Sequence, residues 1–521
     1  MKDEFTKRGP LVNVLISTFN RPRYLYKALA SVLNQSYENM QVFVINDGGK
    51  DVSDIIDSFC DSRVVFINRK ENRGKAFSLN EALEKSEGKY VAYLDDDDIF
   101  YPGHIEILVD ALENRTDCMA AYSDLYKAYC RVSQDGDRQI LSKVVEVSRD
   151  FDRFFMLHFN HVLHVSMMHR RDLVEKTGSY NENLNVLIDW DMTRRLAFFT
   201  DFYHVYEITG QYYHPMGDSD RISVRQRKDK LNYQKNVLAI RTARPKKPWP
   251  KIKDMSIIFT TDKLDSRAGK TIGSIWQHTF YPYKLYLPMS QTDYSRFNTD
   301  MPNLVFVPVN PQSSCEEQID AALEQCEGEY IAIVPAGFPI EDMWIENPLY
   351  ALINRKYEKT GYLPEGVTKD LWAAVIKKED LFFARKNFPG MPVTDSLEAA
   401  GIQLKKPDFE ELPFQFDNIL QKAYSVQNDG DWIQAAKIYE YIAENHRNEL
   451  WMETLAAKAL FEAGRENIAA DLCREINLKR PTVDTLLLEG KVRSREKKYY
   501  NAIDLLTSAE RIIEGHEFLW T

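Results

Sequence analysis

The sequence predicts a multidomain protein, with two α/β units built on mostly parallel sheets and an all-α segment of helical repeats after them. Three observations support this. Apolar runs typical of strands alternate with helical spacings from residue 12, a similar succession returns after residue 254, and continuous helical periodicity begins near residue 414. A chain of 521 residues is also too long for a single hydrophobic core.

Composition indicates ordinary globular domains, with 44% hydrophobic and 28% charged residues. A formal net charge of -11 argues against a protein that coats nucleic acid. The six cysteines are scattered without zinc-binding spacing, so we expect reduced thiols in a cytoplasmic protein. The first apolar stretch is too short for a signal peptide, and no apolar run approaches the roughly 20 residues of a membrane span. Any membrane contact is therefore expected to be peripheral, at the inner face.

The first unit begins with a strand–helix–strand succession. "LVNVLIST" is a short apolar run, Leu25, Leu29 and Val32 follow at helical spacing, and "MQVFVIND" is a second apolar run. "RVVFINR", "KAFSLNEALEKS" and "KYVAYL" continue the alternation, which predicts a parallel sheet. Ligands of such sheets bind beyond the carboxyl ends of the strands, where Thr18, Asp47 and the run "DDDD" fall.

The second unit repeats the first. Residues 12–47 can be laid over residues 255–290 without a gap, and "EGKYVAYLDDDD" lies over "EGEYIAIVPAGF" further on. The simplest account is a duplicated α/β unit. The first three aspartates face Pro335, Ala336 and Gly337, whose side chains offer no oxygen to a cation, so we expect the copy to be chemically silent here.

The last segment contains three similar stretches, "DWIQAAKIYEYI", "RENIAADLCREI" and "KYYNAIDLLTSA". Ala436 and Ala470 are 34 residues apart, the period of tetratricopeptide repeats, and Ala502 follows after 32. About three such repeats suffice to bury a shared core, which predicts a small helical solenoid.

The four aspartates 95–98 directly follow the apolar run "YVAYL". Adjacent carboxylates repel one another unless a cation compensates them. If the strand continues through the run, alternation sets Asp95 and Asp97 on one face, where Mg²⁺ or Mn²⁺ could bind together with substrate phosphates. A solvated loop or an acidic helix start is the structural alternative. A calcium EF-hand is excluded, because Ile99 and Phe100 stand where a ligand and a glycine are needed.

Two further motifs are ambiguous by themselves. Asp189 and Asp191 flank Trp190 at the head of an amphipathic helix, where a capping role is equally plausible. His214 lies among tyrosines in "GQYYHPMGDSDRIS", and a single histidine is more often structural than a ligand. Neither "NDGGK" nor "NRGK" has the spacing of a phosphate-binding P-loop, which leaves a metal to hold phosphates.

Taken together, the motifs resemble the family 2 glycosyltransferases, which have a GT-A fold. The resemblance covers roughly residues 10 to 225, through "STFNRP", "VINDGG", "ENRGKAFSLNEALEKSEGKYVAYLDDDDIFYP", "SMMHRRDLVEKTGSYNENL", "LIDWDM" and "YYHPMGDSDRIS". It implies an inverting, hexosyltransferase-type enzyme that moves a sugar from a nucleotide-diphosphate donor, most often a UDP-sugar. By its alignment with the first unit, the middle unit resembles a second, degenerate GT-A domain.

The resemblance implies roles for matching residues. Thr18 and Asn20 would line the nucleotide pocket, Asp47 would bind the base, usually uracil, and Arg73 would contact phosphate. Asp95 and Asp96 would contact ribose and water around the Mn²⁺ or Mg²⁺ ion, with Asp95 also near the metal. Asp97 would be the direct metal ligand, His214 would lie near the metal and diphosphate, and Asp189 would be the general base for the acceptor hydroxyl.

Three positions depart from the family pattern and put the donor identity in question. Asn46 stands where the family has aspartate, Gly49 where it has serine, and Ile188 where it has glutamate. None of them is a proposed metal ligand or base.

These observations divide the chain into a catalytic GT-A domain, a basic Pro-rich linker, a degenerate GT-A-like domain and a TPR-like helical domain, at residues 1–240, 241–253, 254–412 and 413–521. The predicted function is metal-dependent sugar transfer to a hydroxyl of a glycan, a lipid-linked glycan or a protein, in polysaccharide or glycoconjugate biosynthesis. A non-catalytic nucleotide-sugar or protein-binding scaffold is the alternative, and a nucleotidyltransferase ranks below both. The solenoid would serve a protein partner or self-association, or would pack against its own transferase domains.

Overall fold

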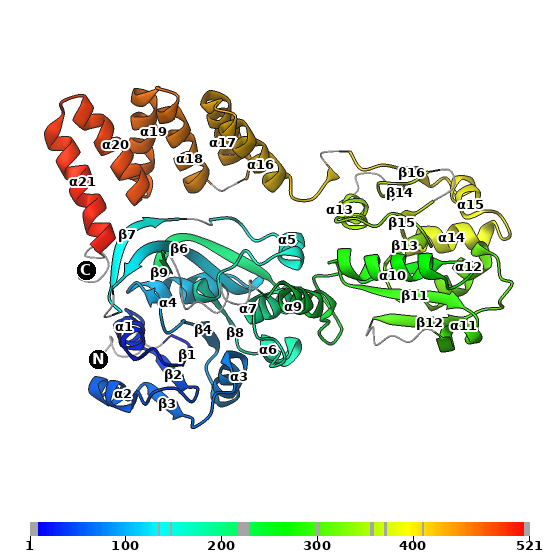
Figure 1. Ribbon diagram of the computed structural model, residues 1–521, viewed down its shortest axis with the longest axis horizontal. Coiled ribbons are helices and arrows are strands. Elements are labelled where there is room, and N and C mark those ends of the chain that lie inside the picture. The colour runs from blue at the N-terminus through cyan, green and yellow to red at the C-terminus, as the bar shows by residue number, and fades with distance from the viewer. Residues whose placement is uncertain are drawn as a thin grey trace. The chain divides into compact units, whose positions relative to one another are not determined.

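The computed structural model describes residues 9–133, 136–145, 148–216, 229–296, 303–354, 359–368, 372–408, 411–446 and 449–514. Contacts divide the chain into two compact units, one made of Met1–Tyr233 with Phe416–Thr521 and the other of Gln234–Gln415. The helical C-terminal segment therefore belongs to the same compact unit as the N-terminal α/β domain (Figure 1).

The N-terminal domain is built on sheet A, whose strand order is β3-β2-β1-β4-β8-β6-β9-β5, with β7 paired to β6. The first four strands in this order are parallel, and most later pairings are antiparallel. The strands are β1 (Val12–Thr18), β2 (Met40–Asn46), β3 (Val64–Asn68), β4 (Tyr90–Tyr93), β5 (Ile99–Phe100), β6 (Cys118–Val132), β7 (Arg138–Val144), β8 (Met167–Arg170) and β9 (Asp201–Pro215).

The helices of this domain connect the strands as the sequence predicted for its first half. They are α1 (Pro22–Leu33), α2 (Ser53–Phe59), α3 (Lys75–Lys85), α4 (His104–Glu113), α5 (Arg153–His158), α6 (Leu173–Thr177) and α7 (Ile188–Leu196), with a short 3-10 turn at His164–Ser166. The helix α1 begins with proline, whose fixed φ suits the first helical position.

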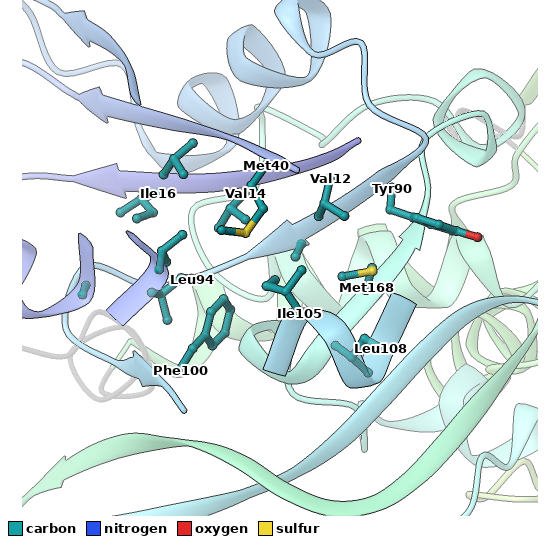
Figure 2. Packing of buried hydrophobic residues seen from close by; sticks show 14 of the residues in the cluster. Val12, Val14, Ile16, Met40, Tyr90, Leu94, Phe100, Ile105, Leu108 and Met168 are labelled. Atoms are coloured by element: carbon teal, nitrogen blue, oxygen red, sulfur yellow. The ribbon is translucent and has the colours of Figure 1, made fainter. Parts of the chain in front are cut away.

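One core lies between sheet A and the helices α1 and α4. Leu25, Leu29 and Val32 of α1, at the predicted helical spacing, are completely buried. Figure 2 shows Ile105 and Leu108 of α4 in the same cluster as Val14 of β1, and both α4 side chains are completely buried as well. This packing holds the carboxyl ends of β1, β2 and β4 in fixed positions.

The second unit repeats the strand order of the first. Sheet B has the order β12-β11-β10-β13-β15-β14-β16, so its parallel half matches β3-β2-β1-β4. Even the register agrees, because Val12 pairs with Met40 and Tyr90 as Met255 pairs with Tyr283 and Tyr330. The predicted duplication of the α/β fold is confirmed.

The strands of sheet B are β10 (Met255–Thr260), β11 (Tyr283–Met289), β12 (Leu304–Pro308), β13 (Tyr330–Pro335), β14 (Thr360–Tyr362), β15 (Ala374–Lys377) and β16 (Gln403–Lys405). The accompanying helices are α9 (Lys230–Thr242), α10 (Ser266–His278), α11 (Gln291–Arg296), α12 (Cys315–Gln325), α13 (Glu346–Ile353), α14 (Lys378–Asn387) and α15 (Val393–Ala399).

The C-terminal segment is all helical, and its helices pack in chain order (Figure 1). They are α16 (Gln415–Asn428), α17 (Trp432–His446), α18 (Glu449–Glu462), α19 (Glu466–Lys479), α20 (Val483–Arg495) and α21 (Tyr499–Glu514). Ala436, Ala470 and Ala502, which marked the repeat in the sequence, are all buried. Small residues at these positions allow neighbouring helices to approach closely.

The helical segment also packs against the N-terminal domain. Tyr101, Tyr126 and Val145 of that domain form one apolar cluster with Val483 and Leu486 of α20 and with Ala509 and Ile512 of α21. Arg149 adds a two-pronged ion pair to Asp417 of α16, at 2.9 and 3.2 Å. Of the two roles considered for the helical segment, packing against the chain's own α/β domain is the one that the structure shows.

In the described residues, no helix is long and apolar enough to cross a membrane.

Candidate functional site

The four aspartates form a turn at the carboxyl end of β4. The strand ends at Tyr93, the N–H of Asp98 donates to the carbonyl of Asp95 at 3.1 Å, and β5 begins at Ile99. Strand alternation was expected to set Asp95 and Asp97 on one face; the structure corrects this, because the turn brings them together. The run does not cap a helix either, since α4 begins later, at His104.

Three of the four carboxylates converge. Asp95, Asp97 and Asp98 each offer one oxygen, and these oxygens lie within 4.8 Å of one another. Carboxylate oxygens are the ligands that Mg²⁺ and Mn²⁺ prefer, so this donor set fits the predicted metal. Asp95 and Asp97 were expected at the metal from the sequence and Asp98 was not, because the choice among adjacent aspartates depends on the geometry of the turn.

Asp96 turns away from this group. It is 5% exposed, accepts a hydrogen bond from Thr18 at 2.7 Å, and pairs with Arg21 at 3.2 Å. Burial and the neighbouring charge of Asp97 raise the pKa of Asp96 to about 6. The side chain therefore links the ends of β1 and β4, a contact that the predicted role at the ribose did not anticipate.

The chain itself supplies cations to the aspartate turn. Arg21 lies 3.0 Å from Asp97, Lys75 lies 2.5 Å from Asp95, and Arg138 lies 3.3 Å from the Asp97 carboxylate and 2.5 Å from its carbonyl oxygen. We expected compensation of the four carboxylates from a bound ion, and the structure shows that part of it comes from these three side chains. They lie 54 and 63 residues apart in the sequence, which is why the linear pattern did not reveal them.

The pair formed by Asp95 and Lys75 is charged. Burial by itself would raise the pKa of Asp95, but the attraction of Lys75, together with that of His164 and Arg21, outweighs burial and lowers that pKa. Burial would lower the pKa of Lys75, but the combined attraction of Asp95, Asp189 and Asp97 outweighs burial and raises that pKa. The described contacts occupy Oδ1 of Asp95 and Oδ2 of Asp97, which leaves the second oxygen of each carboxylate open to a cation.

Asp189 lies in the first turn of α7, whose N-cap position is held by Leu187 with φ 62°. Burial raises the pKa of Asp189, and the nearby ammonium group of Lys75 opposes that shift. Lys75 thus interacts electrostatically with the aspartate turn and with Asp189, which brings the predicted base and the predicted metal site into one electrostatic environment. Asp191 is buried and paired with Arg195 at 2.6 Å, a structural role.

Asn160 contacts the predicted base and was not expected from the sequence. Its side-chain N–H donates to Oδ2 of Asp189 at 3.2 Å, while its carbonyl oxygen accepts from the backbone of Val162 at 3.2 Å and from Thr193 at 3.4 Å. These two bonds orient the amide so that its donor faces Asp189. No motif in the sequence marks Asn160, because its partner is 29 residues away.

The predicted nucleotide-pocket residues lie at the ends of β1 and β2. Thr18 is buried, and Asn20 is exposed with φ 60° and accepts from the backbone of Lys50 at 2.9 Å. Asp47 is buried and accepts from Arg69 at 3.0 Å and from the backbone amides of Arg73 and Gly74 at 2.9 and 2.8 Å. Asp47 therefore anchors the loop before α3, and its role toward a base remains a prediction.

Arg73 lies in the loop just before helix α3. Its guanidinium lies 3.3 Å from the centre of the Phe77 ring, and both residues line a pocket together with Arg171 and Val174. The aspartates do not line this pocket. A phosphate contact by Arg73 stays a prediction.

His214 does not join the three carboxylates in the described structure. It follows Tyr213, whose backbone N–H donates to Asp98 at 3.0 Å, and its own ring packs edge-on against Tyr129 at 5.2 Å. Its role near a metal also stays a prediction. Residues 217–223, the rest of its motif, lie outside the described residues.

Two of the departures from the family pattern have a local explanation. The Asn46 side chain bonds the backbone of Lys50 and Gly49 at 3.0 and 3.2 Å and so shapes the turn after β2. A Cβ at Gly49 would lie 2.7 Å from the backbone nitrogen of Asn20, which leaves no room for serine in this conformation. Nothing in the structure explains Ile188.

The N-terminal region is similar to known proteins. Residues 13–173 match the model of glycosyl transferase family 2. The chain is 30% identical over 191 residues to an uncharacterized glycosyltransferase of Methanocaldococcus jannaschii, covering 35% of this chain and 63% of that one. It is 32% identical over 134 residues to the putative teichuronic acid biosynthesis glycosyltransferase TuaG of Bacillus subtilis, covering 25% and 51%. It is 26% identical over 206 residues to an uncharacterized glycosyltransferase of Rickettsia prowazekii, covering 38% and 63%. The chain thus spans less than two thirds of each of these relatives.

Solved structures with some similarity include S. aureus TarS 1-349 in complex with UDP-GlcNAc, at 15% identity and a TM-score of 0.35, covering 44% of this chain and 66% of that one. The mannosyltransferase PcManGT from Pyrobaculum calidifontis, in complex with GDP-Man and Mn2+, has 16% identity and a TM-score of 0.33, covering 46% and 66%. Residues 13–173, which hold the parallel half-sheet and its terminal aspartates, thus resemble a family 2 glycosyltransferase domain.

Proposed function

We propose that residues 1–240 form a metal-dependent, inverting glycosyltransferase that moves a sugar from a nucleotide-diphosphate donor, a UDP-sugar first among them, to an acceptor hydroxyl. The acceptor would belong to a glycan, a lipid-linked glycan or a protein. Residues 254–412 would be a catalytically silent copy, and residues 413–521 a tetratricopeptide-like support.

One observation carries this proposal: Asp95, Asp97 and Asp98 converge within 4.8 Å at the strand edge of a family 2 domain. In an open α/β sheet, this edge is where ligands bind. The silent copy supports the same conclusion, because β13 repeats β4 in the same register but ends in Pro335 and carries no aspartate after it. The fold therefore does not need these aspartates. Their presence in the first copy is better explained by a chemical role than by a structural one.

A Mn²⁺ or Mg²⁺ ion bound by Asp95, Asp97 and Asp98 would neutralise negative charge on the diphosphate leaving group. Arg21 and Lys75 add positive charge at the same edge of the sheet, close to these carboxylates. Both can exchange a carboxylate partner for a phosphate oxygen, since guanidinium and ammonium groups bind both kinds of anion. Thr18 and Asp96 would then keep β1 and β4 aligned during binding.

Asp189 would take the proton of the acceptor hydroxyl as its oxygen attacks the anomeric carbon. The bond from that carbon to the diphosphate oxygen breaks, and its electron pair leaves with the nucleotide. A carboxylate whose pKa is raised by burial is a stronger base than a solvated one, provided that it remains ionised at neutral pH. The bond from Asn160 and the charge of Lys75 both favour the ionised form.

The test is a panel of nucleotide sugars, each assayed for Mn²⁺-dependent hydrolysis and transfer by the full chain, with Asp97→Ala and Asp189→Asn beside the wild type. We expect one or few donors to turn over, with loss of activity in both variants. Normal turnover in either variant would contradict the assigned roles. Asp191→Asn is not a suitable control because Asp191 holds Arg195, so exposed Asp57→Asn on α2 serves instead.

Calorimetry separates the enzyme from a non-catalytic scaffold that binds only proteins. An enzyme of this class binds UDP in the presence of Mn²⁺, and a decayed domain that recruits partners has no need to. Complete failure of the wild type to bind UDP, GDP or any other nucleoside diphosphate would favour the scaffold.

A further inference from the structure

The strand β7 contacts the aspartate turn at one end and α21, the last helix of the described residues, near the other. Arg138, its first residue, binds Asp97, while Lys143 donates to the backbone carbonyl of Ile512 in α21 at 2.8 Å. Lys143 and Ile512 are 369 residues apart in the sequence. A single short strand thus joins the C-terminal helices to the candidate metal site.

Arg138 is held rigidly at the turn. Its guanidinium lies 3.9 Å from the centre of the Tyr24 ring and 4.4 Å from that of Tyr213, so it is enclosed by two aromatic rings. Its side chain is 7% exposed, and it binds both the carbonyl and the carboxylate of Asp97. Cation–π contacts and charge-assisted bonds together leave the guanidinium little freedom, so it dictates where Asp97 lies.

Lys143 is held just as firmly at the helical side. It is 1% exposed, and burial lowers the pKa of Lys143 to about 7. Its ammonium group lies at the C-terminal end of α21, where helix carbonyls lack partners within the helix and favour a cation. Val145, two residues further, packs in the apolar cluster with Leu486 and Ile512.

Tyr101 provides a second connection. It belongs to the same apolar cluster as the helices, and its hydroxyl lies 3.5 Å from Lys143 and donates to Gln211 of β9 at 3.0 Å. Tyr101 follows the aspartate turn by three residues, and Gln211 precedes Tyr213, whose amide binds Asp98, by two. The helices therefore contact both the strand and the segments that hold the turn.

From these contacts we propose that α20 and α21 position the aspartate turn through β7, with Lys143 acting through Arg138 on Asp97. The helices are then a structural part of the donor site although they do not touch the three carboxylates. Lys143 and Arg138 are positioning residues. Only the identity of the ligand, a nucleoside diphosphate with a divalent cation, rests on the proposed function.

The test compares Lys143→Met with Lys458→Met in the full chain. Methionine keeps the length of the lysine stem but removes the bond to Ile512. Lys458 pairs with Asp484 at 3.0 Å between α18 and α20, so its loss weakens the helices without touching β7. Hydrogen exchange of residues 95–98 is measured without ligand, and the dissociation constant for UDP with Mn²⁺ is measured by calorimetry.

We expect Lys143→Met to speed exchange at residues 95–98 and to weaken UDP binding about tenfold, as contacting residues in one network do. Lys458→Met should change neither. In an Arg138→Ala background, Lys143→Met should cause a much smaller further loss of UDP affinity than in the wild type, because most of its effect passes through Arg138. If Lys143 were merely structural, the losses of UDP affinity from Lys143→Met and Arg138→Ala would add in the double variant.

Wild-type exchange at residues 95–98 and wild-type affinity in Lys143→Met would overturn the proposal, and so would additive losses in the double variant. If Lys143→Met does not fold, Leu486→Ala opens the same apolar cluster from the helical side and takes its place. If the wild type binds no nucleoside diphosphate, the proposed function fails, while the exchange experiment still decides whether the helices hold the turn.

Discussion

Asp124 of β6 and Arg480 at the end of α19 form an ion pair at 2.6 Å across 356 residues of sequence. Asp124 is 2% exposed and also accepts from Ser148 and His204, each at 2.8 Å. A carboxylate with three donors in a buried position is well compensated, and it fixes where the helical segment meets the sheet.

Replacing Arg480 with methionine should destabilise the protein by about 3 kcal/mol, because a buried carboxylate loses its strongest partner. The free energy of unfolding in urea, followed by fluorescence, measures this cost. Arg474→Met on the same helix, where the arginine is exposed, serves as the control and should stay within about 0.5 kcal/mol of the wild type. Equal stability of the two variants would show that the buried pair contributes nothing.

The same cluster predicts a pH dependence. Burial by itself would lower the pKa of His204, but its bonds to Asp124 and Asp150 outweigh burial and raise that pKa above the ordinary value of about 6.5. The stabilisation from charged His204 is then fully present below about pH 6.5 and is lost as pH rises through the raised pKa. We expect the stability advantage of the wild type over His204→Gln to shrink between about pH 6 and pH 9. A stability advantage that grows between these pH values would contradict the positive charge assigned to His204.

Asn160→Ala should lower the catalytic rate without changing donor affinity. The variant removes the donor that orients Asp189, so we expect a loss of about tenfold in kcat, against about a thousandfold for Asp189→Asn. Steady-state kinetics with donor and acceptor varied separately distinguish kcat from KM. Asn183→Ala, an exposed asparagine before α7, is the matched control. A fall in donor affinity with unchanged kcat would show that Asn160 does not act through Asp189.

Lys75→Met should shift the acid limb of activity toward neutral pH. The ammonium group of Lys75 lowers the pKa of Asp95 and opposes the raised pKa of Asp189, so its removal makes both carboxylates easier to protonate. The pH profile of kcat/KM and the affinity for Mn²⁺ at pH 6 and pH 8 measure this effect. Lys70→Met, in the same loop but exposed, should leave the profile unchanged. If the pH profile of kcat/KM for Lys75→Met overlays that of the wild type, Lys75 does not influence the titration of the site carboxylates.

Much of the fold could be predicted because it follows from short-range patterns. Helical spacing at Leu25, Leu29 and Val32 depends on the geometry of one helix, and all three side chains are buried as expected. The duplication could be read from aligned residues, and the register of Met255 with Tyr283 and Tyr330 confirms it. Periodicity and alignment do not depend on how distant segments meet.

The site could be predicted only in part. Motifs located the aspartate run, Thr18 and Asp189, because each sits at the end or the start of a regular element. They missed Asn160 and Asp98, and the cations Arg21, Lys75 and Arg138 had no motif of their own. Such residues are chosen by turn geometry and by loops that converge from different strands, which a linear pattern does not encode.

By itself, the sequence determined two α/β units with the same order of elements along the chain, a helical repeat segment, and an acidic run placed at the carboxyl edge of a parallel sheet. Only the tertiary structure decided that Asp96 turns inward while Asp98 joins Asp95 and Asp97, and that three cations of the chain surround them. It alone decided that the helices pack on the transferase domain through Arg480 and Lys143. The physical reason is range: hydrophobic periodicity acts within one element, whereas ion pairs and buried carboxylates depend on side chains that folding brings together from hundreds of residues apart.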